Sequence, residues 1–206
     1  TGKSVLLKCI IGLLTPDKGQ IFIEDKEIHS LSLNELNEVR KKIGFLFQSA
    51  ALYDSMTVRE NLSFPLKKIF SLSQKECDIK AEETLELVSL AHAIDKMPSE
   101  LSGGMRKRVG LARSIITDPK LMLYDEPTTG LDPITTKEIS KLILDLQTKL
   151  KMTSIIVTHD LICAKIIADR AIFLRNGKIA YQGNIDELTN SKEQFLQNFF
   201  SLEALK

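Results

Sequence analysis

Hydrophobic and polar positions along the chain follow two periods, one typical of helices and the other of strands. Residues 4–14 are apolar on nearly all sides, which indicates a helix buried in an α/β core, and the turn sequence TPDKG ends it. Residues 20–25 alternate like a half-buried strand. Residues 43–48, 121–126 and 153–160 are nearly continuous apolar runs. Such runs are typical of strands in a parallel sheet covered on both faces, so we expect a mainly parallel sheet.

Polar start signals predict where the other helices begin. Three segments carry the capping-box pattern, in which a Ser or Thr cap is followed three residues later by Glu. They are Ser32–Glu35, Thr57–Glu60 and Ser73–Glu76. The last two open a mostly helical stretch that runs to about Ile116. Asp132 and Pro133 are typical of an N-cap and a first turn, and they predict a helix that continues to about Lys151.

The C-terminal part of the chain predicts a hairpin followed by a final helix. Residues 171–183 read as two strands on either side of Asn176 and Gly177, the dipeptide preferred in two-residue hairpin turns. Residues 192–205 follow the pattern of a short amphipathic helix.

The order of these elements predicts the fold class. Strands and helices alternate, except for a block of helices between Gln48 and Leu121. We therefore expect a single α/β domain that contains an inserted α-helical subdomain. Its core would comprise residues 1–50 and 117–206, and the helical subdomain would comprise residues 51–116.

The composition narrows the class of protein. The chain has 206 residues, 43% of them apolar, which is enough to bury one sizeable core. Lys and Arg total 28 against 27 for Asp and Glu, so the charge gives no reason to expect a nucleic-acid partner. The three cysteines are far apart and odd in number, which favours a reduced compartment. No apolar run approaches the roughly 18 residues of a membrane-spanning helix.

The first four residues, TGKS, match the end of the phosphate-binding loop G-x-x-x-x-G-K-[ST], whose earlier glycine is not in the chain. Backbone N–H groups at a helix N-terminus attract phosphate. Lys3 would reach the β- and γ-phosphates, and Ser4 would bind Mg²⁺. Alone, the tetrapeptide also fits an ordinary polar start of a helix.

Two acidic residues follow the apolar run LMLY. Asp125 and Glu126 would lie at the carboxyl end of a strand, where α/β sheets bind ligands. Adjacent side chains of an extended chain point to opposite sides, so the two carboxylates can have different roles. Asp125 suits Mg²⁺, and Glu126 suits a general base that acts on a water molecule. The alternative is an acidic strand-to-loop corner, which is common.

The segment LSGGMRKRVGLARSI is more specific. Ser102 is a candidate N-cap, and Gly103 and Gly104 allow the backbone to approach a ligand closely. Together they predict a second half-site for phosphate. The alternative is a helix N-cap at Ser102 with two mobile glycines after it. The basic run at residues 106–108 is expected on a solvated helix face; the alternative is that it faces the nucleotide of a partner chain.

These motifs together resemble the nucleotide-binding domain of ABC transporters. LSGGM is similar to the family signature, LMLYDE to Walker B, GLD at residues 130–132 to the D-loop, Gln48 to the Q-loop and His159 to the switch histidine. They occur in the family's order, so the resemblance identifies TGKS as the end of Walker A. The resemblance implies a RecA-like P-loop NTPase core. It also implies that the first strands of the family and the first half of Walker A are absent here.

The resemblance further implies ATP and Mg²⁺ as cofactors and a head-to-tail homodimer that encloses ATP. The implied catalytic residues are Glu126, His159, Gln48 and Lys3. The implied ATP-binding residues are Thr1, Gly2, Lys3, Ser4, Ser102, Gly103, Gly104 and Asp132, and the implied metal ligands are Ser4, Gln48 and Asp125. The signature residues of one chain would close the γ-phosphate bound by the other.

Within this family, residues 46–66 and 101–115 resemble the ATPase of Mla/Mce-type phospholipid transport systems, and Met105 stands where most ABC domains have Gln. The resemblance implies a separate membrane permease, a lipid-binding substrate protein and a peripheral location on the cytoplasmic face of the inner membrane. The alternatives are the ATPase subunit of another importer or exporter, or an ABC protein that acts outside transport.

The stretch from Gln48 to Pro65 is expected to form the groove that receives the permease. Its apolar residues lie in a region too irregular for a core strand; they are Leu52, Tyr53, Met56 and Phe64. The alternative is that they fill the interface between the two lobes.

Overall fold

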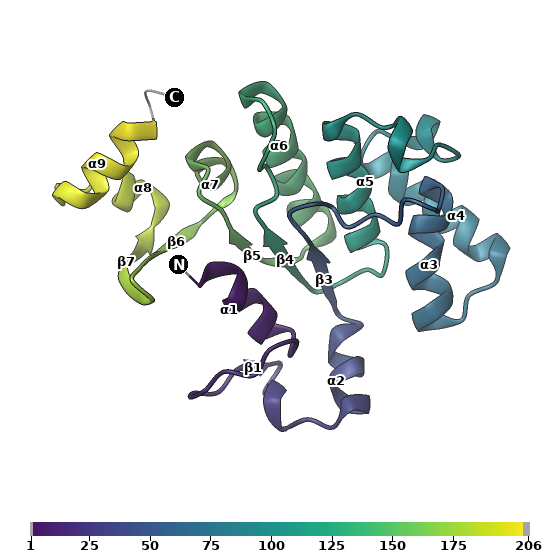
Figure 1. Ribbon diagram of the computed structural model, residues 1–206, viewed down its shortest axis with the longest axis horizontal. Coiled ribbons are helices and arrows are strands. Elements are labelled where there is room, and N and C mark those ends of the chain that lie inside the picture. Colours follow the sequence, from purple (N-terminus) through teal and green to yellow (C-terminus); the bar gives the residue numbers. More distant parts are fainter. Residues whose placement is uncertain (1, 204–206) are drawn as a thin grey trace.

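A three-stranded parallel sheet lies at the centre of the molecule, between a helical block and a C-terminal hairpin (Figure 1). The computed structural model describes residues 2–203. The strands are β3 (Ile43–Leu46), β4 (Leu121–Asp125) and β5 (Thr153–Val157), in the order β3-β4-β5. All three run parallel, as their apolar sequences predict. The carboxyl ends of the three strands therefore lie side by side, and this end of the sheet is referred to below as its carboxyl edge.

The central strand β4 is covered on both faces. Leu123 packs in one apolar cluster with Leu7 and Ile10 of α1 (Lys3–Ile10). Met122 and Tyr124 belong to a second cluster, which includes residues of α5 (Gly103–Ile115) and α6 (Pro133–Leu150). This alternation follows from the two-residue period of a strand. It places α1 and α6 on opposite faces of the sheet.

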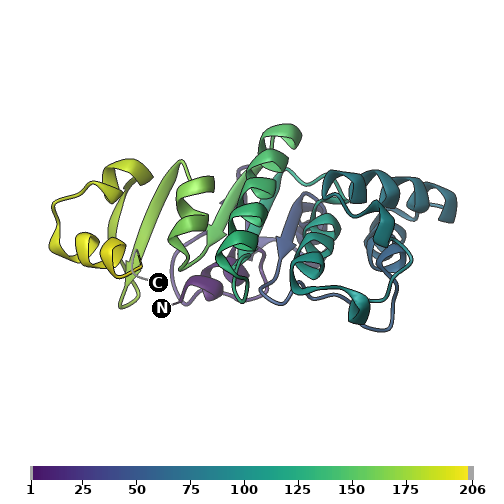
Figure 2. The ribbon, with the colours of Figure 1, turned by 90° about the horizontal axis from the view of Figure 1, so that it is seen from above.

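The helical block contains three long helices, α3 (Val58–Phe70), α4 (Gln74–Leu87) and α5, packed against one another (Figure 2). Two short 3₁₀ turns, η2 (Ala91–Ala93) and η3 (Pro98–Glu100), connect α4 to α5. One apolar cluster runs continuously from α3 and α4 through α5 into β4. The helical block therefore shares its core with the sheet, and its division from the rest at residues 51 and 116 stays a prediction.

The predicted helix starts are confirmed. Ser32, Thr57 and Ser73 cap α2 (Leu33–Arg40), α3 and α4, and all three capping boxes are closed by their Glu side chains. Asp132 caps α6, and its carboxylate accepts hydrogen bonds from two backbone N–H groups. Each capping signal involves residues within one helical turn, so the start of the helix depends little on distant parts of the chain.

The N-terminal region differs from its prediction. The helix expected over residues 4–14 ends at Ile10, and Gly12 then reverses the chain with a φ of +68°. The strand expected over residues 20–25 is reduced to β1 (Phe22–Ile23), which pairs only with β2 (Lys26–Glu27). Two polar residues in the left-handed conformation form the turn between them, and the pairing stops there; they are Glu24 and Asp25. A short 3₁₀ turn, η1 (Ile28–Ser30), leads to α2.

The C-terminal hairpin is confirmed. Strands β6 (Arg170–Arg175) and β7 (Lys178–Asn184) pair antiparallel around Asn176 and Gly177, which have φ values of 50° and 72°. Two left-handed residues in succession match the twist of a tight hairpin. The remaining helices are α7 (Leu161–Ile167), α8 (Ile185–Thr189) and α9 (Gln194–Glu203), and the last of them confirms the predicted final helix.

Candidate functional site

The carboxyl edge of the sheet gathers the polar residues that the sequence singled out. Asp125 is the last residue of β4, and Glu126 follows it. His159 comes two residues after β5 ends. Gln48 was expected as the last residue of its strand, but β3 ends at Leu46, and Gln48 lies in the loop beyond. The N-terminus of α1 meets the same edge and brings Lys3, because α1 packs on β4.

Ser4 and Asp125 form the first contact at this edge. The Ser4 hydroxyl donates to Oδ1 of Asp125 at 2.7 Å, across 121 residues of sequence. Asp125 is only 8% exposed. Together with the side-chain amide oxygen of the nearby Gln48, this carboxylate and this hydroxyl form the all-oxygen set of ligands that Mg²⁺ prefers. The residues present therefore fit the predicted magnesium site.

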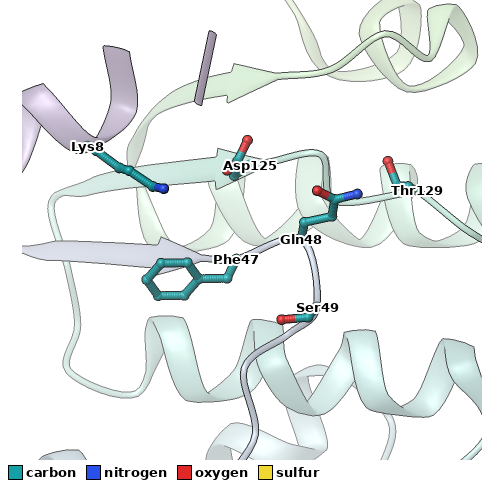
Figure 3. Close-up of a pocket in the computed structure, with 6 residues that line it drawn as sticks. All are labelled: Lys8, Phe47, Gln48, Ser49, Asp125 and Thr129. Atoms are coloured by element: carbon teal, nitrogen blue, oxygen red, sulfur yellow. The ribbon is translucent and has the colours of Figure 1, made fainter. Parts of the chain in front are cut away.

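A cavity of about 500 Å³ adjoins this contact. Asp125, Gln48 and Thr129 line it from different elements, and Figure 3 shows the Gln48 side chain between the other two. Lys8 of α1 and Phe47 line the same cavity. Lys8 had no signal in the sequence, because it lies within an apolar helix and matches no motif. The cavity therefore combines oxygen ligands with a cation.

Lys3 lies beside the second carboxylate. Its Nζ is 3.6 Å from Oε1 of Glu126 and donates to the carbonyl of Thr158 at 3.4 Å. Gly2 precedes it as the N-cap of α1, with a φ of +85° that favours glycine. Thr1, also expected to bind nucleotide, lies outside the described residues. A cation is therefore placed at the start of a helix whose N–H groups face the same edge.

The Glu126 side chain is held from several directions. Its Oε2 lies 2.8 Å from Nδ1 of His159 and also accepts from the His159 backbone N–H at 3.3 Å. The Thr129 hydroxyl donates to the same oxygen at 3.3 Å. The backbone of Glu126 is left-handed, with a φ of 51°, and its N–H donates to Val157. The two carboxylates have separate partners, because Asp125 accepts from Ser4 whereas Glu126 contacts His159, Thr129 and Lys3.

The second half-site is elsewhere on the molecule. Ser102 caps α5 and accepts from the Met105 N–H at 3.3 Å. It lines a separate cavity of about 440 Å³ together with Gly103, Gly104 and the segment from Gly130 to Asp132. Among the described residues, the two cavities have no lining residue in common. The structure thus gathers seven of the predicted residues, which are Gly2, Lys3, Ser4, Gln48, Asp125, Glu126 and His159, and leaves the signature residues apart from them.

The Asp132 carboxylate is held by hydrogen bonds within the first turn of α6. Its carboxylate accepts from the N–H groups of Ile134 and Thr135, both at 3.0 Å, and from the Thr135 hydroxyl. The Thr135 hydroxyl and N–H hold the pKa of the Asp132 carboxyl below its usual value. The carboxylate thus caps α6, Asp132 also lines the cavity of Ser102, and its role in nucleotide binding stays a prediction.

Lys107 corrects an expectation from the sequence. The basic run at residues 106–108 was expected to face solvent, but Lys107 is only 7% exposed. Its ammonium donates to the backbone carbonyl of Gln48. Burial lowers the pKa of Lys107, and the negative charge of Glu126 partly opposes this shift. The spacing of residues along α5 does indicate that Lys107 is buried, because Lys107 shares a helix face with the buried Gly110 and Leu111.

The family model described as ABC transporter matches residues 1–129. The chain belongs to the ABC transporter family. It is 40% identical over 201 residues to the "Probable ribonucleotide transport ATP-binding protein mkl" of Mycobacterium leprae, covering 98% of this chain and 58% of that protein. It is 41% identical over 187 residues to the "Methionine import ATP-binding protein MetN" of Carboxydothermus hydrogenoformans, covering 91% of this chain and 55% of that protein.

A further relative is from a plant. The Arabidopsis thaliana protein "TRIGALACTOSYLDIACYLGLYCEROL 3, chloroplastic" is 41% identical over 220 residues, covering 97% of this chain and 62% of that protein. This ABC chain therefore spans somewhat more than half the length of these curated relatives.

Solved structures of ABC cassettes have the same fold. The ATP-binding cassette MJ0796, in a dimeric post-hydrolysis state bound to ADP and Pi, superposes with a TM-score of 0.80 at 32% identity, covering 89% of this chain and 81% of that one. The cbiO1 protein of Clostridium perfringens, part of the transporter complex cbiONQ, reaches a TM-score of 0.84 at 32% identity, covering 99% and 81%. The predicted RecA-like P-loop fold is confirmed. Within residues 2–203, no helix is both long and apolar enough to cross a bilayer.

Proposed function

We propose that this ABC chain binds ATP with Mg²⁺, hydrolyses it and powers transport through a separate membrane permease. The observation that carries the proposal is the position of Glu126, held by His159 and Lys3 directly beside the Ser4–Asp125 pair. Attack of water on a phosphate needs a carboxylate that accepts the proton of the water, a cation that binds the phosphate and oxygen ligands for a metal ion. Glu126, Lys3 and the Ser4–Asp125 pair provide these three groups.

Each residue at the sheet edge has a distinct role in this proposal. Ser4, Asp125 and Gln48 would hold Mg²⁺, which when bound neutralises charge on the phosphates. Lys3 would bind the β- and γ-phosphates, exchanging for them its long contacts to Glu126 and to the Thr158 carbonyl, at 3.6 and 3.4 Å. Glu126 orients a water molecule and accepts its proton.

His159 orients the general base. Two groups of this one residue contact Oε2 of Glu126, the ring Nδ1 and the backbone N–H. A carboxylate fixed in this way keeps its other oxygen, Oε1, directed toward Lys3. Positioning of this kind lowers the barrier because the reacting groups lose little freedom in the transition state.

The second half-site supports a dimer. Ser102, Gly103 and Gly104 form a cavity of their own at the N-terminus of α5, away from the first cavity. A phosphate bound between the two half-sites of different chains would join them. We infer a head-to-tail homodimer with two ATP molecules, which opens when the γ-phosphate is lost.

The segment following Gln48 is proposed to contact the permease. Asn61 is fully buried and binds the backbone of Tyr53 and Met56, so this irregular segment is rigid. Tyr53 is 40% exposed and packs against Phe64 with ring centroids 5.1 Å apart. A rigid surface with an exposed aromatic ring is suited to docking a permease helix. This contact would keep the subunit at the cytoplasmic face of the inner membrane.

Phospholipid is the proposed cargo. It is supported by the resemblance of residues 46–66 and 101–115 to Mla/Mce-type ATPases and by Met105 in the signature. One relative also bears the name of a glycerolipid. The relatives named for ribonucleotide transport and methionine import favour other cargo at similar identity. A lipid-binding substrate protein would deliver or receive the lipid.

Reconstitution tests the proposed function. The full-length protein, co-purified with its permease and placed in vesicles, should move a fluorescent phospholipid when ATP and Mg²⁺ are supplied. The Glu126→Gln complex should not, whereas Glu83→Gln, which changes an exposed glutamate of α4, should be as active as the parent. ATP-driven uptake of methionine without lipid movement would contradict the proposed cargo while leaving the ATPase role intact.

A further inference from the structure

We propose that Lys107 is a positioning residue for ATP hydrolysis, which holds the loop of Gln48 so that the glutamine side chain points into the cavity beside Asp125. The inference rests on the proposed role of Gln48 at the magnesium site. It assigns to α5, the helix that begins at the signature residue Ser102, a second task at its own chain's catalytic edge.

The first observation is the buried contact itself. Lys107 is 7% exposed, and its ammonium donates to the carbonyl of Gln48, 59 residues away in sequence. Removing an ammonium group from water is unfavourable unless it gains partners. Here, the gains are the Gln48 carbonyl and the negative charge of Glu126 nearby. The Gln48 carbonyl and the negative charge of Glu126 therefore stabilise the buried ammonium.

The second observation is the strained backbone of the loop that Lys107 contacts. Ala50 and Ala51 are consecutive and both left-handed, with φ values of 63° and 47°. Alanine disfavours this conformation because its Cβ crowds the carbonyl oxygen that follows. Such a turn persists only when surrounding contacts determine it. The loop after Gln48 therefore needs external support.

The third observation is that α5 supplies this support from one face. Gly110 lies three residues from Lys107 and three from Arg113, so it is a neighbour of both on the helix surface. Arg113 donates to the carbonyl of Ala51 and lies over the ring of Tyr53, 4.7 Å from its centroid. Gly110 allows the closest approach, because a Cβ there would come within 2.6 Å of the Ala50 Cβ. Helix α5 therefore contacts the loop through Lys107, Gly110 and Arg113.

These contacts fix the direction of the Gln48 side chain. With its carbonyl held by Lys107, the Gln48 amide lies between Asp125 and Thr129 in the cavity (Figure 3). Because the support comes from α5, a displacement of Ser102 at the helix start would be transmitted to Gln48. The signature of one nucleotide site and the magnesium contact of another would then move together.

The test compares Lys107→Met with Lys107→Arg, which retains a charged donor, and with Lys141→Met, which changes an exposed lysine of α6. Full-length proteins are used with their permease, and Gln48→Ala is the reference. Hydrogen–deuterium exchange of residues 47–53 is measured without nucleotide. Steady-state hydrolysis is measured against ATP and against Mg²⁺.

Lys107→Met is expected to speed exchange in residues 47–53 and to raise the half-saturating Mg²⁺ concentration by about 10-fold or more, as the loss of outer-shell partners does in metal sites. The KM for ATP at saturating Mg²⁺ should stay within about threefold of the parent, since Lys107 is not among the described residues that line either cavity. Lys107→Arg should lie closer to the parent, and Lys141→Met should match it. Combining Lys107→Met with Gln48→Ala should add little further loss, because both act through one side chain.

Three results would overturn the proposal. They are unchanged exchange in residues 47–53, an unchanged Mg²⁺ requirement, or losses from Lys107→Met and Gln48→Ala that multiply in the double variant. If Lys107→Met does not fold, Lys107→Gln replaces it, because its side chain is neutral and its donor is one bond nearer the backbone. An inactive Gln48→Ala beside a Lys107 variant with an unchanged Mg²⁺ requirement would refute this inference alone. A fully active Gln48→Ala would refute the proposed magnesium role.

Discussion

Nδ1 of His159 lies 2.8 Å from Oε2 of Glu126, although 33 residues separate them in sequence. The contact joins the loop after β5 to the loop after β4, and the backbone N–H of His159 reinforces it at 3.3 Å. The histidine side chain is 63% exposed and that of the glutamate only 14%. The imidazole thus covers the carboxylate from the solvent side, while Lys3 approaches its other oxygen.

Glu126→Gln is expected to lower ATP turnover by roughly 10²–10⁴-fold, because the amide cannot accept the proton of the attacking water. ATP binding should persist, since Lys3 and the Ser4–Asp125 pair are unchanged. The measurement is steady-state phosphate release by the full-length protein with its permease, beside nucleotide binding by fluorescence. The matched control, Glu83→Gln, changes an exposed carboxylate of α4. Turnover of the Glu126 variant within about tenfold of the parent would refute the general-base role.

ATP is expected to join two chains. The Glu126→Gln protein should become dimeric with ATP and Mg²⁺ but stay monomeric with ADP, because the γ-phosphate bridges the two half-sites. Adding Ser102→Arg should abolish the dimer, since it places bulk and charge where the phosphate must approach closely. Light scattering measures the mass under each condition. The same mass in all of them would count against the head-to-tail arrangement.

Tyr53→Arg and Met56→Arg are expected to uncouple the subunit from its permease. Both residues lie in the rigid segment before α3, and a charge there would need to be desolvated in an apolar interface. The variants should bind ATP normally, yet fail to co-purify with the permease or to support lipid movement. Phe70→Arg, at the exposed far end of α3, serves as the control. If both variants still formed active complexes, the permease would have to dock elsewhere.

Cys163 is expected to be inert until the protein unfolds. Its side chain is fully buried, and burial raises the pKa of its thiol to about 11. Iodoacetamide at pH 8 should therefore modify it only in denaturant, as mass spectrometry of the labelled peptide would measure. The raised pKa in the folded state also means that Cys163 stabilises the fold below the ordinary thiol pKa. This contribution is lost as pH rises from there toward 11. Rapid labelling of the native protein would contradict the expected burial.

Local signals in the sequence were sufficient to predict many of the helices and strands. Ser32, Thr57 and Ser73 each cap the predicted helix, because a capping box involves only residues within one turn. Asn176 and Gly177 form the predicted hairpin for a similar reason. The apolar run of β4 also predicted a buried central strand, since no other position in an α/β fold accommodates it.

The sequence by itself therefore determined most element types and nominated most of the candidate site residues, because both depend on residue identity and short spacing. Tertiary structure alone decided which of these residues meet. The pairing of His159 with Glu126 spans 33 residues, and that of Lys107 with Gln48 spans 59. Such contacts depend on the strand order β3-β4-β5 and on how α5 packs against β3, which no local pattern encodes. For the same reason, a lysine that looked solvated in sequence is buried in the fold.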